Sequence, residues 1–125
     1  MARILVLDDN AEIVTLLRMA LEREGYQVVT GRNGGEGIRL IEQAAITPDL
    51  IICNLLMPLM DGITFLDLLR QRTEWSVIPV LMLTALTSDG TRQAAFDHGA
   101  NAFLYKPFRL ADLSSAIGDL GIHPH

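Results

Sequence analysis

The sequence predicts an α/β fold in which a parallel five-stranded sheet is covered by helices on both faces. Short apolar segments alternate with segments of helical periodicity along the whole chain of 125 residues. The apolar segments are hydrophobic throughout rather than at every second position, which indicates strands buried on both sides. The five expected strands are residues 3–7, 27–30, 50–53, 80–83 and 102–105.

The first helix is predicted by apolar residues spaced three and four apart, and Gly25 follows as a stop signal. Its apolar stripe consists of Ile13, Leu16, Leu17, Ala20 and Leu21. Similar patterns predict helices around Ile38, Ile41 and Ala45, around Phe65, Leu66 and Leu69, from Arg92 to Phe96 before Gly99, and around Leu110, Leu113, Ile117 and Leu120. These elements are expected to form one domain, residues 1–121, followed by a loose C-terminal tail, residues 122–125.

The composition argues against several classes of function. The net charge is −5 and the arginines are dispersed, so direct binding to nucleic acid is not expected. No apolar stretch approaches the ~18 residues of a membrane span, and the N-terminus does not resemble a secretory signal. A cytoplasmic protein is therefore expected. The one cysteine, Cys53, lies within an apolar run and is expected to be a core residue without redox function.

Polar residues follow four of the expected strands. Because the carboxyl ends of parallel strands meet at one edge of a sheet, these side chains should lie close together. They are Asp8, Asp9, Asn54, Thr84 and Lys106. An acidic residue in this position often caps a helix, although Asn10 is an alternative cap here. The combination of two carboxylates, a hydroxyl and a lysine at the ends of different strands favours a functional site.

These residue types suit phosphoryl chemistry. Paired carboxylates attract Mg²⁺, which takes oxygen ligands and keeps several waters. Lys106, the one lysine among ten basic residues, offers a point charge to a phosphate oxygen, and the Thr84 hydroxyl can donate to another. The sequence thus predicts a phosphoryl site that lacks an obvious acceptor.

Four motifs spread over essentially the whole chain carry a resemblance to a known family. They are ILVLDDN, PDLIICNLLMPLMDG, PVLMLTA and GANAFLYKPF. Together they resemble the response-regulator receiver domains of two-component signalling. The resemblance implies a flavodoxin-like doubly wound sheet of strand order 2-1-3-4-5. It also implies a function in which a histidine kinase donates a phosphoryl group to an aspartate, and Asn54 occupies the position of that aspartate.

The resemblance also implies roles for individual residues. The Mg²⁺ ligands would be Asp8, Asp9, Asn54 and the backbone carbonyl of Leu56. Lys106 would contact phosphate, Thr84 would be the switch hydroxyl, and Phe103 would be the switch aromatic. Without the resemblance, Phe103 reads as an ordinary core aromatic. The bond between Lys106 and Pro107 is implied to be cis.

Asn54 changes the chemistry that the family pattern implies. An amide oxygen is neutral and its nitrogen lone pair is delocalised, so Asn54 is not expected to accept a phosphoryl group. The pocket would hold two formal negative charges instead of three, so Mg²⁺ binding should be weakened. Less repulsion between carboxylates should make the domain at least as stable as its Asn54→Asp variant without Mg²⁺.

Two histories account for this asparagine. Because Asp8, Asp9, Thr84 and Lys106 are all retained, a deliberate substitution or a recent loss is favoured. The alternative is a natural pseudo-receiver that acts as an interaction module independent of phosphorylation. A plain turn residue is a further, lesser interpretation of Asn54.

The expected output is protein–protein interaction rather than catalysis. Upstream partners would be a sensor histidine kinase or a phosphotransfer protein. A downstream partner would bind the fourth helix, fifth strand and fifth helix, which include residues 92–98, Phe103 and residues 109–120. The apolar loop residues Leu55, Leu56, Met57, Leu59 and Met60 either fold inward, which is favoured, or contact a partner or a second copy of the chain.

The weaker alternative is a small enzyme. An FMN protein would need a phosphate-binding loop rich in Gly, Ser and Thr after the first strand, and DDNAEIV is not such a loop. An aspartyl phosphatase would carry Asp-x-Asp where this chain has adjacent Asp8 and Asp9. The chain could also be one part of a longer protein with an output domain.

Overall fold

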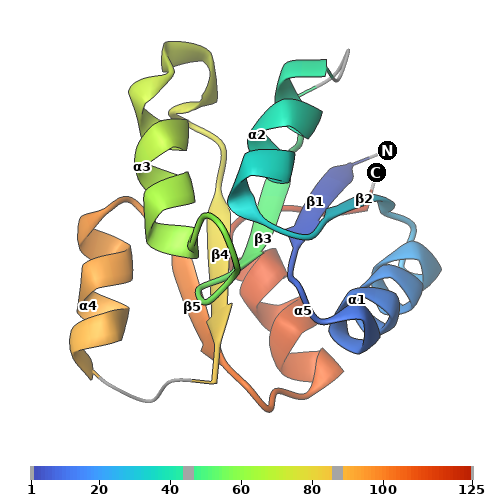
Figure 1. Cartoon of the computed structure of the whole chain (residues 1–125). Helices are drawn as coiled ribbons and strands as arrows, with labels where there is room; N and C mark the ends of the chain where they lie inside the picture. Colours follow the sequence, from blue (N-terminus) through green and yellow to red (C-terminus); the bar gives the residue numbers. More distant parts are fainter. Residues whose placement is uncertain (1, 44–46, 86–88, 125) are drawn as a thin grey trace.

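Five parallel strands form one sheet in the order β2-β1-β3-β4-β5 (Figure 1). The structure is a computed structural model that describes residues 2–43, 47–85 and 89–124. The strands are β1 (Arg3–Leu7), β2 (Gln27–Gly31), β3 (Leu50–Asn54), β4 (Val80–Thr84) and β5 (Ala102–Tyr105). The predicted parallel sheet and its strand order are confirmed.

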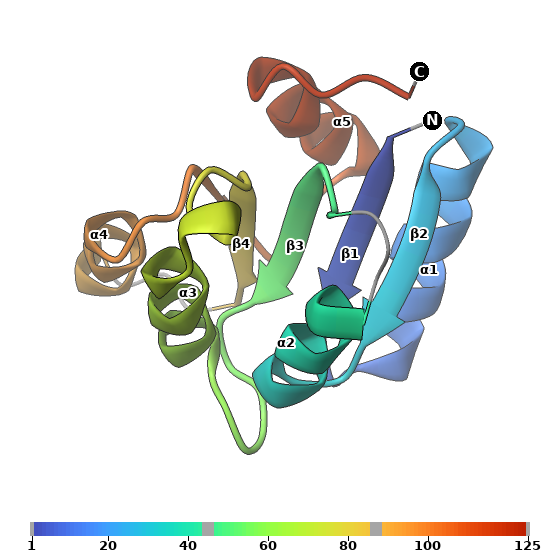
Figure 2. The same cartoon turned by 90° about the horizontal axis from the view of Figure 1, so that it is seen from above.

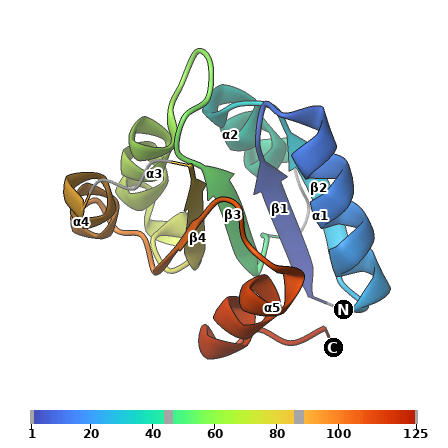
Figure 3. The ribbon, with the colours of Figure 1, turned by 90° about the horizontal axis from the view of Figure 1, so that it is seen from below.

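Helices connect successive strands and cover both faces of the sheet. They are α1 (Ala11–Arg23), α2 (Gly34–Gln43), α3 (Gly62–Gln71), α4 (Asp89–Asp97) and α5 (Leu110–Asp119), with a short 3₁₀ helix η1 (Thr73–Trp75) after α3. Helices α1 and α5 lie on one face, while α2, α3 and α4 lie on the other (Figures 2 and 3). Ala45, predicted to belong to the second helix, lies outside the described residues. In the described part of the chain, no helix combines the length and hydrophobicity needed to cross a membrane.

The sheet separates two hydrophobic cores because alternate residues of a strand point to opposite faces. In β1, Ile4 and Val6 pack into the core formed with α1 and α5, which contains Leu17 and Ile117. Leu5 and Leu7 pack into the other core. The central strands β3 and β4 are buried along their whole length, as their continuous apolar sequences predict.

The ends of α1 follow the sequence signals. The Asn10 side chain caps the helix by accepting hydrogen bonds from the backbone N–H groups of Glu12 and Ile13 at 2.9 and 3.2 Å. Gly25 has a φ of +103°, a backbone conformation that suits glycine after a helix. Leu16 differs from its predicted place in the core, since 46% of it is exposed, whereas Leu17 and Leu21 are fully buried.

The last residues are not the loose tail that the sequence suggested, at least as far as Pro124. Ile122 is buried beside Tyr26, whose hydroxyl donates a hydrogen bond of 3.3 Å to the Ile122 carbonyl. The backbone N–H of Ala2 donates to the Pro124 carbonyl. An apolar Ile122 explains this docking, because its burial removes hydrophobic surface from water. The boundary of the domain at residue 121 remains a prediction.

Candidate functional site

The polar residues predicted at the strand ends come together at the carboxyl edge of the sheet. Asp8 directly follows β1, Asn54 ends β3 and Thr84 ends β4. All three are buried, and Asp8 and Thr84 are each only 1% exposed. Asp9 is exposed. Such burial of polar side chains requires hydrogen-bonding partners, and for Asp8 and Asn54 the neighbouring residues supply them.

Lys106 connects two of these strand ends. Its Nζ donates to Oδ2 of Asp8 at 2.9 Å and to Oδ1 of Asn54 at 3.2 Å. Its backbone N–H donates to the Thr84 carbonyl at 2.7 Å, which extends the pairing of β4 with β5. The bond between Lys106 and Pro107 is cis, as predicted. The one lysine of the chain is therefore part of the acidic cluster.

The amide nitrogen of Asn54 faces the oxygen atoms of the pocket. Nδ2 lies 2.7 Å from the backbone carbonyl of Leu56, 3.4 Å from Oδ1 of Asp8 and 3.5 Å from Oδ1 of Asp9. The Asp8 Oδ1 also accepts a hydrogen bond from the backbone N–H of Asn10 at 2.9 Å. Asn54 thus contacts each of the other three residues predicted as Mg²⁺ ligands.

The chemistry of these oxygen atoms suits a hard cation only in part. Two carboxylates and a backbone carbonyl are donors that Mg²⁺ accepts, with water completing its shell. Within the described residues, however, no group of three or more His, Cys, Asp or Glu side chains is placed to hold a metal ion. The fourth predicted ligand residue, Asn54, presents N–H donors to the cluster instead of an oxygen ligand.

The neighbouring Cys53 does not take part in this site. Its side chain is fully buried in the core of α2, α3 and α4, and its thiol lies 3.4 Å from the Asn54 carbonyl. Burial, and then the negative charges of Asp8 and Asp61, raise the pKa of the Cys53 thiol well above its ordinary value. Cys53 is therefore a core residue, as the sequence predicts, and its burial favours the neutral thiol.

Phe103 lies on β5 in a row of aromatic side chains. Its ring centroid is 6.4 Å from that of Phe96 on α4 and 5.1 Å from that of Tyr105, which it meets edge to face. It is partly buried and packs against the core below α4. Phe103 thus lies between this core and the surface formed by α4 and β5. Its switch role remains a prediction.

The loop between β3 and α3 divides its apolar residues between core and surface. Leu55 and Met57 are buried, which agrees with the favoured interpretation for these two. Leu56 and Leu59 are 56% and 96% exposed, so for them the inward orientation is wrong. Leu59 also has a φ of +69°, which is uncommon for a bulky residue.

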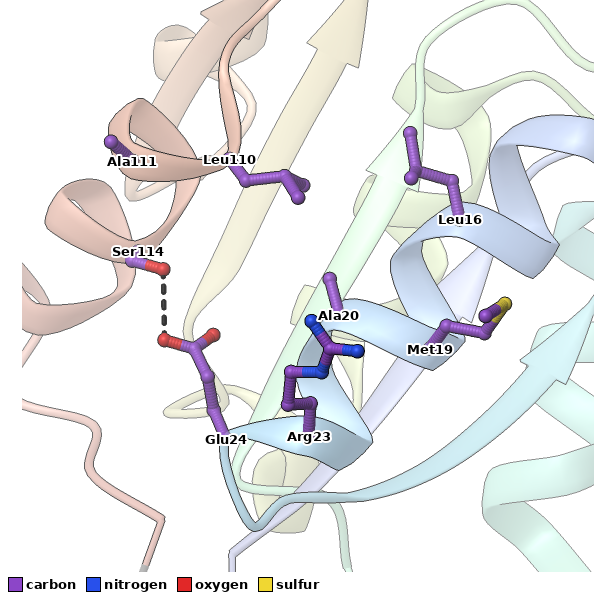
Figure 4. Close-up of a pocket in the computed structure, with 8 residues that line it drawn as sticks. All are labelled: Leu16, Met19, Ala20, Arg23, Glu24, Leu110, Ala111 and Ser114. Atoms are coloured by element: carbon purple, nitrogen blue, oxygen red, sulfur yellow. Dashed lines mark hydrogen bonds between the residues drawn. The ribbon is translucent and has the colours of Figure 1, made fainter.

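A hollow between α1 and α5 was not predicted from the sequence. It has a volume of about 390 Å³, and Figure 4 shows side chains of both helices around it. Its lining consists of Leu16, Met19, Ala20, Arg23, Glu24, Leu110, Ala111 and Ser114. The Ser114 hydroxyl donates to the Glu24 carboxylate across one end at 2.9 Å. The sequence gives little sign of this hollow. Leu16 and Met19 are apolar residues that lie exposed, and helical periodicity had predicted that Leu16 would lie in the core.

Comparison with known proteins identifies the fold as that of one family. The sequence profile described as "Response regulator receiver domain" matches residues 4–118. The chain belongs to the response regulator receiver domain family. As a receiver domain, it belongs to two-component signalling, in which such domains interact with histidine kinases and downstream effectors.

Similar proteins include bacterial transcriptional regulators. The chain is 36% identical over 115 residues to the alkaline phosphatase synthesis transcriptional regulatory protein PhoP of Bacillus subtilis, covering 92% of the chain and 46% of PhoP. It is 38% identical over 117 residues to the KDP operon transcriptional regulatory protein KdpE of Escherichia coli, covering 94% of the chain and 50% of KdpE. The receiver domain thus spans about half the length of these curated relatives.

Solved structures of receivers have the same architecture over nearly their whole length. A putative response regulator from Chloroflexus aurantiacus superposes with a TM-score of 0.89 at 32% identity, covering 95% of this chain and 96% of that one. The chemotaxis protein CheY4 of Vibrio cholerae also has a TM-score of 0.89 at 32% identity, covering 95% and 98%. These similarities agree with the observed strand order.

Proposed function

We propose that this receiver domain is not phosphorylated at Asn54 and acts through protein contacts rather than as an enzyme. The observation that carries the proposal is the place of Asn54, at the end of β3 between Lys106 and the carboxylates of Asp8 and Asp9. The resemblance to receivers assigns this position to the phosphoryl acceptor. An amide there does not form a stable phosphoryl adduct, because it is neutral and poorly nucleophilic.

The other pocket residues support the chemistry that a receiver uses. Asp8, Asp9 and the Leu56 carbonyl would hold Mg²⁺, while Lys106 and Thr84 would contact phosphate oxygens. When bound, the cation would neutralise the negative charge that accumulates around a phosphoryl group. With an amide in place of a third carboxylate, we expect this chain to bind Mg²⁺ only weakly.

Protein partners would bind the surface formed by α4, β5 and α5. Phe103 lies between Phe96 and Tyr105 on this side, and the Arg92 guanidinium lies 5.6 Å from the Phe96 ring centroid. A downstream protein or a second copy of the chain would bind here, and a histidine kinase or phosphotransfer protein would approach the acidic pocket. The net charge of −5 supports a protein partner over direct contact with nucleic acid.

Two origins of Asn54 remain compatible with this function. Retention of the pair between buried Asp8 and Lys106, and of buried Thr84, supports an exchange of a single residue, by deliberate substitution or recent loss. A natural pseudo-receiver that works without phosphorylation is the alternative. Both predict a silent acceptor position.

An NMR titration with Mg²⁺ and beryllofluoride, a phosphoryl analogue, tests the proposal. In the Asn54→Asp variant, the analogue should shift the resonances of Thr84 and Phe103. The unaltered chain should show no such shifts at the same concentrations. Shifts of equal size in both proteins would contradict a silent acceptor position.

A further inference from the structure

The NH₂ group of Asn54 points at the same oxygen atoms that are proposed to bind Mg²⁺. Its Nδ2 lies 2.7 Å from the Leu56 carbonyl, 3.4 Å from Asp8 Oδ1 and 3.5 Å from Asp9 Oδ1. On its other side, Oδ1 accepts a hydrogen bond of 3.2 Å from Lys106 Nζ. The amide therefore bridges the acidic half of the pocket and its lysine.

The surrounding groups allow only this orientation of the amide. The ammonium of Lys106 has no lone pair, so it requires an oxygen opposite it. The carboxylates and the Leu56 carbonyl accept hydrogen bonds, so they require a donor. Turning the amide by 180° would place Oδ1 among three acceptors and would place the NH₂ group against the ammonium.

We propose that the Asn54 amide fills the cation position of this pocket from within, so that Mg²⁺ must displace it. The inference rests on the proposed function, because it takes Asp8, Asp9 and the Leu56 carbonyl as the cation ligands. Two N–H groups with partial positive charge replace a divalent ion in front of the acidic oxygens. Asn54 is then a competitor of the metal rather than a weak ligand for it.

The competition arises because an amide carries one oxygen where a carboxylate carries two. An aspartate at position 54 could direct one oxygen to a cation and the other to Lys106. Asn54 has a single acceptor atom, and Lys106 holds it. A metal ion that takes this oxygen leaves two donors, Nδ2 and Nζ, facing each other, and a metal ion that does not take it must still displace the N–H groups.

The first test compares Mg²⁺ affinity in three proteins by NMR titration of backbone amides around Asp9. The proteins are the unaltered chain, Asn54→Asp and Asn54→Ala. If Asn54 were a weak ligand, its removal in Asn54→Ala would weaken binding. If Asn54 blocks the site, alanine exposes the carboxylates, a water molecule can complete the metal shell, and affinity rises. We expect Asn54→Ala to bind Mg²⁺ at least threefold more tightly than the unaltered chain, and Asn54→Asp to bind most tightly.

A second test does not depend on the alanine variant. Lys106→Met removes the ammonium that holds the amide oxygen, so Asn54 becomes free to turn this oxygen toward the metal. Loss of a positive charge raises Mg²⁺ affinity in any background, and the Asn54→Asp protein measures that general gain. We expect Lys106→Met to raise affinity at least threefold more in the Asn54 background than in the Asn54→Asp background.

The outcomes separate this inference from the proposed function. Failure of Asn54→Asp to bind Mg²⁺ would overturn the assignment of the cation ligands, and the internal competitor with it, whereas the silent acceptor position at Asn54 would still stand on its own titration with beryllofluoride. Tight binding by Asn54→Asp, with Asn54→Ala equal to or weaker than the unaltered chain, would overturn only the internal competitor. Equal effects of Lys106→Met in both backgrounds would overturn it as well.

Discussion

Lys106 Nζ lies 2.9 Å from Oδ2 of Asp8, a carboxylate that is 1% exposed. The two residues are separated by most of the chain, since one follows β1 and the other follows β5. Removing a carboxylate from water is costly unless an opposite charge and hydrogen bonds replace the lost hydration. The Lys106 ammonium, itself 18% exposed, and the Asn10 backbone N–H provide that replacement.

Lys106→Met should therefore destabilise the fold, because it leaves the Asp8 carboxylate buried without its cation. We expect a loss of about 2 kcal/mol in the free energy of unfolding, measured by urea denaturation at neutral pH. Arg109→Met is the matched control, because Arg109 pairs with Asp112 at 3.4 Å while 86% exposed. Its effect should stay below about 0.5 kcal/mol. Equal losses in the two variants would show that the Asp8 pair contributes no special stability.

Arg70, near the end of α3, should also contribute to the stability of the fold. Its guanidinium donates to the backbone carbonyls of Trp75, Ser76, Ile78 and Gly99 and to the Asn101 side chain, at 2.8 to 3.4 Å. Burial lowers its pKa from the ordinary value, but an arginine remains charged at neutral pH. Because a lysine cannot reproduce the planar fork, Arg70→Lys should cost about 2 kcal/mol in thermal or urea unfolding.

Arg18→Lys provides the comparison for Arg70. Arg18 is exposed, and one of its hydrogen bonds reaches the Thr30 hydroxyl at 3.1 Å. Its replacement should change stability by less than about 0.5 kcal/mol. A similarly small change for Arg70→Lys would mean that its carbonyl partners are satisfied equally well by water.

Strand positions and pocket residues were predictable because they depend on local sequence and on a simple rule of topology. Apolar runs end at polar residues, and parallel strands bring those residues to one edge. Predicted and observed strands differ by at most one residue at an end, as at Gly31, Asn54 and Thr84.

The remaining features depend on tertiary contacts that a single sequence does not encode locally. Periodicity placed Leu16 on the apolar stripe, but the width of the buried face depends on where α5 packs, and Leu16 lies beyond it. The sequence did not predict the hydrogen bonds of Arg70, because its partners are mainly backbone carbonyls from separate segments. The orientation of the Asn54 amide likewise depends on which groups converge around it.

Gly62 at the start of α3 should not tolerate a side chain. A Cβ atom there would lie 2.9 Å from the Asn54 carbonyl oxygen and 3.0 Å from the Leu55 Cα, and backbone atoms cannot easily move aside. Gly62→Ala should therefore cost about 2 kcal/mol. Gly118 in α5 has open space around its Cβ position, so Gly118→Ala should instead stabilise the domain by about 0.5 kcal/mol. Thermal unfolding of both variants checks the opposite signs.

The buried thiol of Cys53 should make stability fall in alkaline solution. Its pKa in the folded protein is raised above the ordinary value of 9.0, mainly by burial. Above about pH 9 the unfolded chain therefore loses the thiol proton while the folded protein keeps it, which favours unfolding by about 1.4 kcal/mol per pH unit. Below that pH both states hold the proton, and the contribution is constant.

Cys53→Ala should remove this part of the pH dependence. Urea unfolding between pH 7 and about pH 10.5 should show a steeper decline for the unaltered chain than for the variant. Burial also raises the pKa of Tyr26. Because Tyr26 is present in both proteins, its ionisation does not produce a difference between their curves. Parallel curves would show that the Cys53 thiol ionises equally in both states.

Asn54→Asp should lower stability when no divalent metal is present. The new carboxylate would place negative charge where Nδ2 now lies, 3.4 and 3.5 Å from oxygen atoms of Asp8 and Asp9. It would also leave the Leu56 carbonyl without the donor that now lies at 2.7 Å. Attraction to Lys106 offsets part of this repulsion, so we expect a loss of about 1 kcal/mol in urea unfolding with EDTA present.

Asn33→Asp is the control for Asn54→Asp, because it makes the same substitution outside the pocket. Asn33 accepts a hydrogen bond from the Glu36 backbone N–H at the start of α2, and an aspartate can do the same. This variant should therefore differ little from the unaltered chain, with or without Mg²⁺. Adding Mg²⁺ should restore or reverse the loss in Asn54→Asp, because the cation neutralises three crowded carboxylates. An Asn54→Asp protein that is more stable than the unaltered chain in EDTA would show that Lys106 outweighs the repulsion from Asp8 and Asp9.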